Sequence, residues 1–482
     1  MKKINLIASI LISFLSCKIV FAQTIPETKF TKPNLPVFLV NGFVDFSAAS
    51  RNQAAIFEQK TLPNGITDNR LSNTQAIGND SQFFFKSGIM TENKDKYGAV
   101  AKVEFNVNSD RKSEMPNLDQ AFIYSQNSFG KFELGNNQAV NQKMKSSPAH
   151  FARGAGGING KYLENINMPI LANSPTTICS GTNCSNVKFP SFIMLAQSPI
   201  GHGGGARSFY NNSADSVQND FNSFNRSNFR ALKDDSFDGV EDATKINYYS
   251  PRIAGLQLGI SYASDSADSG ITSTKYYNVN GIRIKNIMSF GVNYSEDFDN
   301  LGVEISATAE RGKMQNSQSS IGVERSDLGA YDIGATFSYF GFNFGASYGS
   351  WGKSMQPKNG IYSCDYNSSE TLLLQTCATN VKKFEDPHYY TAGIAYAFGP
   401  IATSITGIKS KFQENSYEAI SLGVDYKLSR ALMPYVEITK FAFKSNQPNS
   451  SDIINQYAIS SNQRQIKNNQ GYILLTGILI SF

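Results

Sequence analysis

The stretch Asn286–Glu310, NIMSFGVNYSEDFDNLGVEISATAE, decides the fold. Apolar and polar residues alternate along it twice, before and after a short polar break at Glu296–Asp299. A period of two is typical of strands, so the stretch predicts a β-hairpin with one apolar and one polar face. The polar face holds small residues such as Gly291 and Ser306, which could not fill a sandwich core but suit a face that meets water.

The same unit recurs along all 482 residues. Aromatic residues make up 12% of the chain and glycine occurs 38 times, a composition that favours strands over helices. No stretch after residue 22 approaches the roughly 18 consecutive apolar residues of a membrane helix. Only every second residue of a membrane β-strand faces lipid, however, so a mean hydropathy of −0.30 does not exclude a membrane protein.

The alternation predicts sixteen strands. They cover residues 37–49, 81–91, 97–107, 119–128, 130–136, 242–252, 255–264, 286–295, 300–310, 329–339, 341–349, 389–398, 400–409, 417–427, 431–443 and 471–482. Short joints, such as 93–96 and 128–130, interleave with long ones, as periplasmic turns and extracellular loops do in outer-membrane barrels. We therefore expect an all-β fold, a sixteen-stranded antiparallel transmembrane β-barrel over residues 37–482. A soluble β-sandwich or solenoid is the alternative.

The N-terminal segment favours export. A basic start, an apolar run over residues 4–15 and a small residue at Ala22 predict a cleaved signal peptide at residues 1–22. An uncleaved anchor and a lipidated Cys17 are the alternatives. Residues 23–36 contain three prolines and are predicted to be a linker. The formal net charge of +5 falls to +2 without the three lysines of the signal segment, which gives no argument for nucleic acid.

The remaining cysteines agree with export. They form two close pairs, each inside a predicted loop: Cys179 with Cys184, and Cys364 with Cys377. An oxidising compartment favours a disulfide within each pair. The histidines nearest to them show no zinc-like spacing, so no metal site is predicted.

Several segments resemble the general diffusion porins of Gram-negative bacteria, chiefly their alphaproteobacterial branch. They are ATKINYYSPRIAGLQLGISY at 243–262, NGFVDF at 41–46, FGKFELG at 129–135 and the final Phe482. In that family the final Phe is part of the assembly signal. The resemblance implies a barrel in outer-membrane lipid, usually a homotrimer, whose long third loop folds into the lumen and narrows it.

The matching loop here is 137–241, with short joints at the opposite, periplasmic rim. Its residues Pro148, Phe151, Gly154, Gly156 and Gly157 resemble the Pro-x-Phe-Gly-Gly core of the family's loop. Family loops set acids against basic residues on the wall. Where many members have Gly-Arg at the end of the fifth strand, this chain has Gly135-Asn136, which argues against a strong anion preference.

Charged groups that face each other across a narrow, water-filled gap create a transverse field that filters solutes. The predicted alternation places candidate constriction residues on the wall and in the loop. The wall residues are Lys86, Lys102, Glu104, Lys131 and Glu133, and the loop acids are Asp234, Asp235, Asp238 and Glu241. The alternative for each residue is a solvated charge without a special role.

Enzyme functions receive little support from the sequence. His150, His202 and His388 all lie in predicted loops, so a lipase or protease site on a strand lacks its usual base. The glycines around His202 resemble an oxyanion-hole loop, but no Gly-x-Ser-x-Gly elbow accompanies them. No catalysis and no cofactor are expected.

The sequence therefore predicts an outer-membrane porin, a water-filled channel for passive diffusion of small hydrophilic solutes and ions. The alternative is a surface adhesin or structural barrel, whose loops at 51–80, 137–241, 350–388 and 444–469 would bind host or envelope partners.

Overall fold

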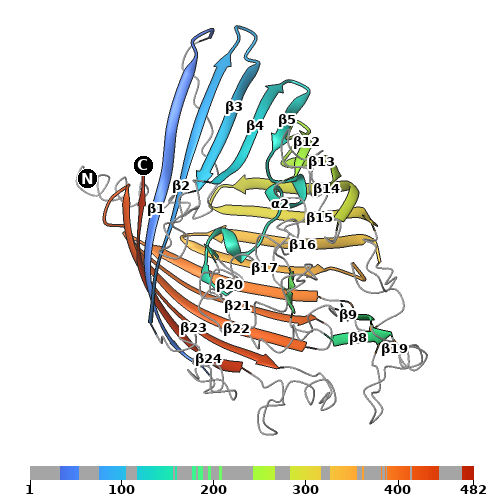
Figure 1. The fold of residues 1–482 in the computed structure, drawn as a ribbon. Helices are drawn as coiled ribbons and strands as arrows, with labels where there is room; N and C mark the ends of the chain where they lie inside the picture. Colours follow the sequence, from blue (N-terminus) through green and yellow to red (C-terminus); the bar gives the residue numbers. More distant parts are fainter. Residues whose placement is uncertain are drawn as a thin grey trace.

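Sixteen strands close into a barrel in the computed structural model of the chain (Figure 1). The structure describes residues 33–53, 75–104, 117–155, 158–159, 176–180, 183–187, 194–196, 206–208, 243–265, 283–315, 326–354, 361–362, 381–382, 386, 388–412, 415–444 and 469–482. No helix in these ranges is long and apolar enough to cross a membrane.

Every barrel strand pairs antiparallel with both of its neighbours. In barrel order the strands are β1 (Val37–Asn52), β2 (Gln75–Met90), β3 (Lys96–Glu104), β4 (Asn117–Asn127), β5 (Gly130–Asn136), β12 (Thr244–Tyr249), β13 (Leu256–Asp265), β14 (Arg283–Phe298), β15 (Leu301–Gln315), β16 (Leu328–Tyr339), β17 (Phe342–Ser350), β20 (His388–Phe398), β21 (Ile401–Phe412), β22 (Asn415–Tyr426), β23 (Leu432–Lys444) and β24 (Asn469–Ser481). The sixteen-stranded barrel predicted from the alternation is therefore confirmed.

The two ends of the sheet close on each other. β1 pairs with β24 from Phe43↔Ser481 to Asn52↔Tyr472. Phe482 extends this seam, because its N–H donates to the Gly42 carbonyl (3.1 Å) and its own carbonyl accepts from the Gly42 N–H (3.0 Å). The last strand thus leaves no bare edge beside β1, which removes the sites at which open sheets pair with other chains.

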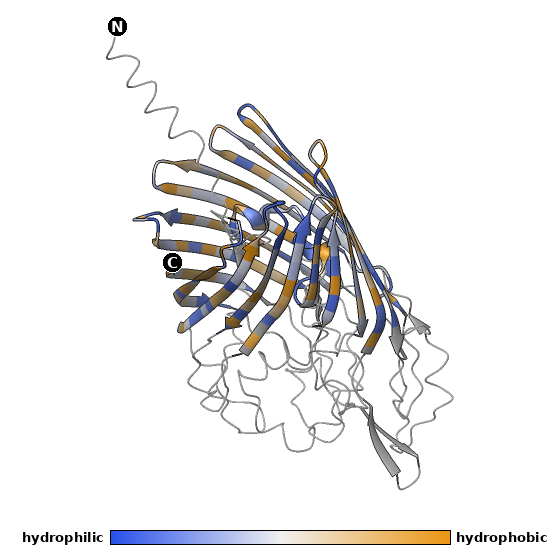
Figure 2. Cartoon of the chain, turned by 90° about the horizontal axis from the view of Figure 1, so that it is seen from above, coloured by the Kyte–Doolittle hydropathy of each residue, from blue (hydrophilic) through white to orange (hydrophobic). Residues whose placement is uncertain are grey.

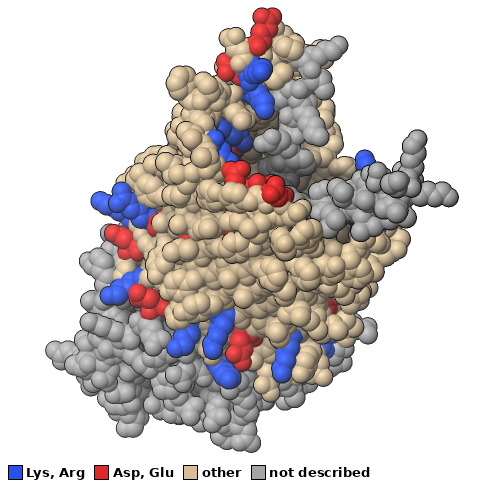
Figure 3. Space-filling model, turned by 180° about the vertical axis from the view of Figure 1, so that it is seen from behind, with Lys and Arg blue, Asp and Glu red and all other residues tan. Residues whose placement is uncertain are grey.

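The alternation of the sequence becomes two different faces. Large apolar side chains are exposed on the outside, among them Phe46, Ile123, Phe132, Ile305, Ile438 and Leu474. Polar residues at the alternate positions, such as Asp45, Ser306 and Glu437, are buried on the inside. Seen from above, hydrophilic and hydrophobic segments alternate along the strands (Figure 2). From behind, charged side chains flank a broad, largely uncharged belt (Figure 3).

Tight turns join the strands at one rim. β16 and β17 are joined by Phe340 and Gly341 alone, with φ of 45° and 84°. Two successive positive φ values are typical of the type I′ turn, whose twist matches that of a hairpin, and glycine adopts them without strain. Long connections follow β1, β3, β5, β13, β15, β17 and β23 at the other rim, where the β21–β22 joint, residues 413–414, is short. The predicted alternation of joint lengths is thus present.

The strand predicted at 242–252 is shorter in the structure and ends at Tyr249. Pro251 has no N–H and cannot continue the ladder. The chain turns instead, held by the Leu258 N–H, which donates to Ser250 Oγ (2.9 Å). The Arg252 guanidinium also donates to the Gly255 carbonyl (2.6 Å). The joint predicted at 253–254 therefore spans 250–255.

Short elements interrupt the connection after β5. They are α2 (Val140–Lys143), η3 (Pro148–His150), and the parallel pair β6 (Arg153–Gly154) and β7 (Ile158–Asn159), followed by β8 (Thr176–Ser180), β9 (Asn183–Val187), β10 (Met194–Ala196) and β11 (Ala206–Ser208). A further pair, β18 (Ile361–Tyr362) and β19 (Val381–Lys382), lies between β17 and β20. α2 lies inside the ring of barrel strands (Figure 1).

Candidate functional site

Residues 137–155, which we call the luminal loop, run along the inner wall of the barrel. Backbone N–H groups of the loop donate to inward-facing serine hydroxyls of four strands. The pairs are Val140 to Ser261 on β13 (2.9 Å), Ser146 to Ser306 on β15 (2.7 Å), Arg153 to Ser404 on β21 (3.1 Å) and Ala155 to Ser421 on β22 (2.8 Å). The chain beyond β5 thus folds into the lumen, as the resemblance implied.

Small residues on the wall let the loop lie close to it. A Cβ atom at Gly393 of β20 would lie 2.9 Å from Pro148 Cβ, and one at Gly345 of β17 would lie 2.8 Å from the Phe151 ring. Contacts this short would force the loop or the wall to shift, since they are below ordinary van der Waals separation. The inward glycines therefore leave the space on the wall that Pro148 and Phe151 of the loop occupy.

Three ion pairs attach the luminal loop to the wall at well-separated strands. Lys143 Nζ lies 2.6 Å from Glu133 Oε2 on β5, Lys145 Nζ lies 3.7 Å from Asp332 Oδ2 on β16, and Arg153 Nη2 lies 2.5 Å from Asp425 Oδ1 on β22. In all three pairs the loop supplies the cation and the wall supplies the acid. This is the reverse of the arrangement that the resemblance implied.

Lys145 is held in a buried polar cluster. Its ammonium donates to the Tyr389 hydroxyl (3.3 Å), which in turn donates to Asp332 Oδ2 (2.5 Å). Burial lowers the pKa of Lys145 to about 8, although Asp332 and Glu310 favour the charged form. The charge of this loop residue therefore changes within an experimentally accessible pH range.

Arg153 continues the chain of contacts to the seam of the barrel. Its guanidinium donates from both Nε and Nη2 to Asp425 Oδ1 (2.9 and 2.5 Å) and lies 3.7 Å from the centre of the Tyr435 ring. The Tyr435 hydroxyl donates to Asp45 Oδ1 on β1 (2.9 Å). One arginine thus links the loop to β22, β23 and β1. A buried arginine held this way combines an ion pair with a cation–π contact.

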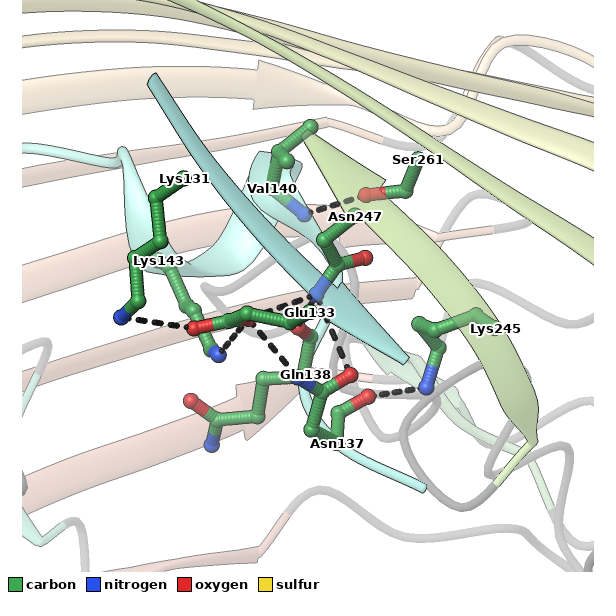
Figure 4. A network of polar contacts seen from close by, with 9 residues as sticks. All are labelled: Lys131, Glu133, Asn137, Gln138, Val140, Lys143, Lys245, Asn247 and Ser261. Carbon is green, nitrogen blue, oxygen red and sulfur yellow. Dashed lines mark hydrogen bonds and ion pairs between the residues drawn. The ribbon is translucent and has the colours of Figure 1, made fainter. Parts of the chain in front are cut away.

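Glu133 is the centre of a second network, at the start of the loop (Figure 4). Its carboxylate lies 2.9 Å from Lys131 Nζ and 2.6 Å from Lys143 Nζ. It also accepts from the side-chain amides of Asn137 (2.7 Å) and Asn247 (3.1 Å). One carboxylate thus faces two ammonium groups, which leaves an excess of positive charge at this point of the wall.

The wall residues predicted from the alternation all lie on inward positions. Lys86 is on β2, with its ammonium 5.7 Å from the Phe84 ring centre. Lys102 and Glu104 of β3 form an ion pair of 3.0 Å, and Lys131 and Glu133 lie on β5. The predicted loop acids Asp234, Asp235, Asp238 and Glu241 lie outside the described residues. That the wall residues form the constriction remains a proposal.

The structure describes only one of the two predicted cysteine pairs. Cys179 and Cys184 stand opposite each other in the register of β8 and β9, and their disulfide remains a prediction. Cys364, Cys377 and His202 lie outside the described residues.

His388 was predicted to lie in a loop, and this was wrong, because it is the first residue of β20 and pairs with both Ser350 and Lys411. Strand ends are the least determined part of an alternation, since one polar residue fits either side. Within the described part of the chain, no group of three or more His, Cys, Asp or Glu could hold a metal ion.

Of the residues that attach the loop by ion pairs, the sequence predicted only Glu133 as a site residue. Asp332 and Asp425 occupy inward positions of correctly predicted strands, so the alternation could have singled them out. Lys143, Lys145 and Arg153 form a run of loop cations without an intervening acid. The family's usual charge arrangement pointed instead to the loop acids near residue 240.

The lumen has two electrostatic sectors among the described residues. The positive sector comprises Lys86, Lys102, Lys131, Lys143 and Lys245 with Glu104 and Glu133, on β2, β3, β5, β12 and α2. The negative sector comprises Glu304, Glu310, Asp332, Asp425 and Glu437 with Lys145 and Arg153, on β15, β16, β22, β23 and the loop. Opposite charge on two parts of a closed wall creates a field across the lumen.

A closed barrel with an apolar outside, a charged inside and an inserted third loop is typical of one group of membrane proteins. A profile of the family described as Gram-negative porin matches residues 9–446. The chain belongs to this family. This porin is therefore a transmembrane barrel of the outer membrane, with its short turns periplasmic and its long loops extracellular.

The chain is also similar to bacterial proteins and to a solved structure. An uncharacterized protein of Rickettsia typhi is 25% identical over 497 residues, which covers 92% of this porin and 94% of the relative. An uncharacterized protein of Rickettsia conorii is 26% identical over 371 residues, covering 68% and 70%. The anion-selective porin from Comamonas acidovorans superposes with a TM-score of 0.50 at 13% identity, covering 93% of this chain and 100% of that one, which shows a shared fold.

Proposed function

We propose that the barrel is a passive channel through which small hydrophilic solutes and ions diffuse across the outer membrane. The observation that carries this proposal is the inward face itself. It is lined by charged and polar side chains, and a loop attached by three ion pairs lies along it. A polar, charged lumen favours hydrated solutes.

The two charged sectors support a channel that filters by polarity and charge distribution. The positive sector exceeds its acids, and the negative sector keeps an excess of carboxylates after Lys145 and Arg153 are paired. Cations and anions would each find a favourable side of the lumen, so we expect a weak net charge preference. Lys86, Lys102, Glu104, Lys131 and Glu133 are the wall residues that we propose for the constriction, with the luminal loop beside them.

The remaining proposals follow from the family. The working form is a homotrimer, residues 1–22 are removed on export, and the protein performs no catalysis. Cross-linking of the purified porin and N-terminal sequencing of the mature chain test the first two. A screen for esterase and protease activity tests the third.

Planar-bilayer recording tests the channel directly. Purified porin should insert in uniform conductance steps, and liposomes that contain it should swell in sugars up to a defined size limit. Insertion without conductance would contradict the proposal and favour the adhesin alternative, in which the extracellular loops bind partners.

A further inference from the structure

An inward tyrosine crosses one strand to reach a carboxylate on the next. Tyr389 of β20 stands opposite Gly349 of β17, which stands opposite Asp332 of β16. The tyrosine lies over the glycine, since a Cβ atom at Gly349 would come within 2.3 Å of the Tyr389 hydroxyl. That hydroxyl donates to Asp332 Oδ2 (2.5 Å). Neighbouring strands lie about 4.8 Å apart, so a long side chain reaches the second strand and the glycine between leaves it room.

The same arrangement recurs at the seam of the barrel. Tyr435 of β23 stands opposite Gly477 of β24, where a Cβ atom would come within 2.4 Å of the Tyr435 hydroxyl. The hydroxyl donates to Asp45 Oδ1 of β1 (2.9 Å). Both tyrosines are buried. We call each set of tyrosine, glycine and carboxylate a tyrosine bridge.

Each tyrosine bridge holds one cation of the luminal loop. At the first, Lys145 donates to the Tyr389 hydroxyl (3.3 Å), so this tyrosine acts through its hydroxyl. At the second, the Arg153 guanidinium lies 3.7 Å from the Tyr435 ring centre, so this tyrosine acts through the face of its ring. Its hydroxyl bond to β1 fixes the direction of that ring. The two bridges therefore hold the two ends of residues 145–153.

The chain between the two bridges packs against the wall. Pro148 and Phe151 lie against the glycines of β20 and β17 that leave them room. If residues 145–153 were released, they would move into the lumen, because the closed sheet behind them leaves no other direction. The position of this segment therefore affects the free width of the lumen.

A third inward tyrosine provides a comparison. Tyr124 of β4 lies over Gly98 of β3, where a Cβ atom would come within 2.6 Å of the Tyr124 hydroxyl. The ammonium of Lys131 on β5 lies 5.5 Å from the centre of its ring. Tyr124 thus shares the packing of the other two tyrosines, but the cation at its ring belongs to the wall.

We propose that Tyr389 and Tyr435 are positioning residues of the channel, which hold residues 145–153 against the wall and thereby set the size limit for solutes. This inference rests on the proposed channel function and adds to it the residues that determine the free width of the lumen. Both tyrosines act through the loop and not through a charge of their own.

Single-channel conductance of the purified porin in planar bilayers tests Tyr389. Tyr389→Phe keeps the ring over Gly349 and removes the hydroxyl between Lys145 and Asp332. We expect conductance to fall about twofold, and liposome swelling to slow more in large sugars than in small ones. Tyr124→Phe is the matched control and should keep the wild-type conductance. A general loss of barrel stability would reduce the number of insertions but not the conductance of each inserted channel.

The second bridge is tested in the same way. Tyr435→Leu removes the ring that Arg153 contacts, and Tyr124→Leu is its matched control. Conductance should again fall about twofold in the first variant and stay at the wild-type value in the second. An equal fall in both would overturn the role of Tyr435.

A double variant shows whether Tyr389 acts through the loop. When Lys145→Met is already present, Tyr389→Phe should lower the conductance no further, because the cation that the hydroxyl positions is absent. A full additional loss in the double variant would overturn the proposal. Equal conductance of Tyr389→Phe and Tyr124→Phe would also overturn it.

Hydrogen exchange in detergent separates this inference from the proposed function. The amides of residues 146–153 should exchange about tenfold faster in Tyr389→Phe than in Tyr124→Phe. Equal exchange would overturn the holding of the loop by Tyr389, whatever the channel does. A wild-type protein that inserts without conductance would overturn the proposed function instead.

Discussion

The inner wall of this porin has two unlike regions. Beneath the luminal loop, β13–β22 present small inward residues, among them Gly259, Gly291, Gly345, Gly393, Ser404 and Gly423. On β2–β5 the inward residues are large, among them Lys86, Phe84, Lys102, Phe122 and Glu133. Both regions belong to one sheet with the same alternation of inward and outward residues. The difference in the size of their inward side chains therefore does not follow from strand geometry.

The difference shows what each region faces. A backbone can lie against a wall only if the inward side chains are small, and the backbone N–H groups of Val140, Ser146 and Ala155 donate to serines on the small-residue side. Large charged side chains on the other region reach into the lumen and carry its field. The small-residue region positions most of the loop, whereas the charged region carries the field and also anchors the start of the loop through Glu133 and Lys143.

The largest expected effect comes from Asp425→Ala. Removing one partner of a buried ion pair leaves Arg153 uncompensated, at a cost of about 3 kcal/mol. The loop should detach before the barrel unfolds, and its amides, including those of Arg153 and Ala155, should exchange hydrogen about a hundredfold faster. Mass-spectrometric hydrogen exchange on the loop measures this.

The matched control removes both partners. Arg153→Ala together with Asp425→Ala leaves no buried charge, so exchange should accelerate less than in Asp425→Ala alone. If the double variant exchanged as fast as the single variant, the ion pair would not be what holds this end of the loop.

A smaller effect is expected when the space between the wall and the loop at Gly393 is filled. Gly393→Ala introduces a Cβ atom 2.9 Å from Pro148 Cβ, and overpacking of this kind costs about 1–3 kcal/mol. Loop amides near η3 should exchange about tenfold faster. Gly329→Ala on β16 is the control, since its Cβ atom would meet nothing within 4 Å. Equal hydrogen exchange in both variants would show that the position of the loop does not depend on the small inward residues of the wall.

The charged region is tested by Glu133→Gln. This change removes the carboxylate that faces Lys131 and Lys143 and leaves both ammonium groups in place. The anion-to-cation permeability ratio should rise about threefold, as read from reversal potentials in a salt gradient. Glu418→Gln removes a carboxylate from the outer surface and should leave the ratio unchanged. An equal change of the permeability ratio in both variants would show that the effect does not depend on the position of Glu133 in the lumen.

The smallest effect is a pH dependence. Burial lowers the pKa of Lys145 to about 8, so its ammonium is charged below that pH and loses its proton above it. Raising the pH from about 6.5 to about 9.5 should therefore make the lumen more negative and increase cation preference by less than about twofold. Lys145→Met should show a smaller change between these pH values than the wild type. A wild-type ratio that stays constant would indicate that Lys145 does not titrate in this range.

The sequence determined the barrel because period-two alternation is local. Whether Ile305 faces out and Ser306 faces in follows from neighbouring residues alone, since a one-residue slip would move every apolar side chain to the wrong face. The same reasoning placed Lys86, Lys102 and Glu133 on the inner wall. It was weaker at strand ends, as at Tyr249 and His388, where no alternation remains to fix the boundary.

Only the tertiary structure decided which charges meet. Arg153 and Asp425 are 272 residues apart in sequence, and Lys145 and Tyr389 are 244 apart. No local pattern records such a pairing, because it depends on the path of the loop through a closed lumen. The neighbours in sequence thus determined whether a residue faces inward or outward. The closure of the sheet determined which side chain it contacts across the lumen.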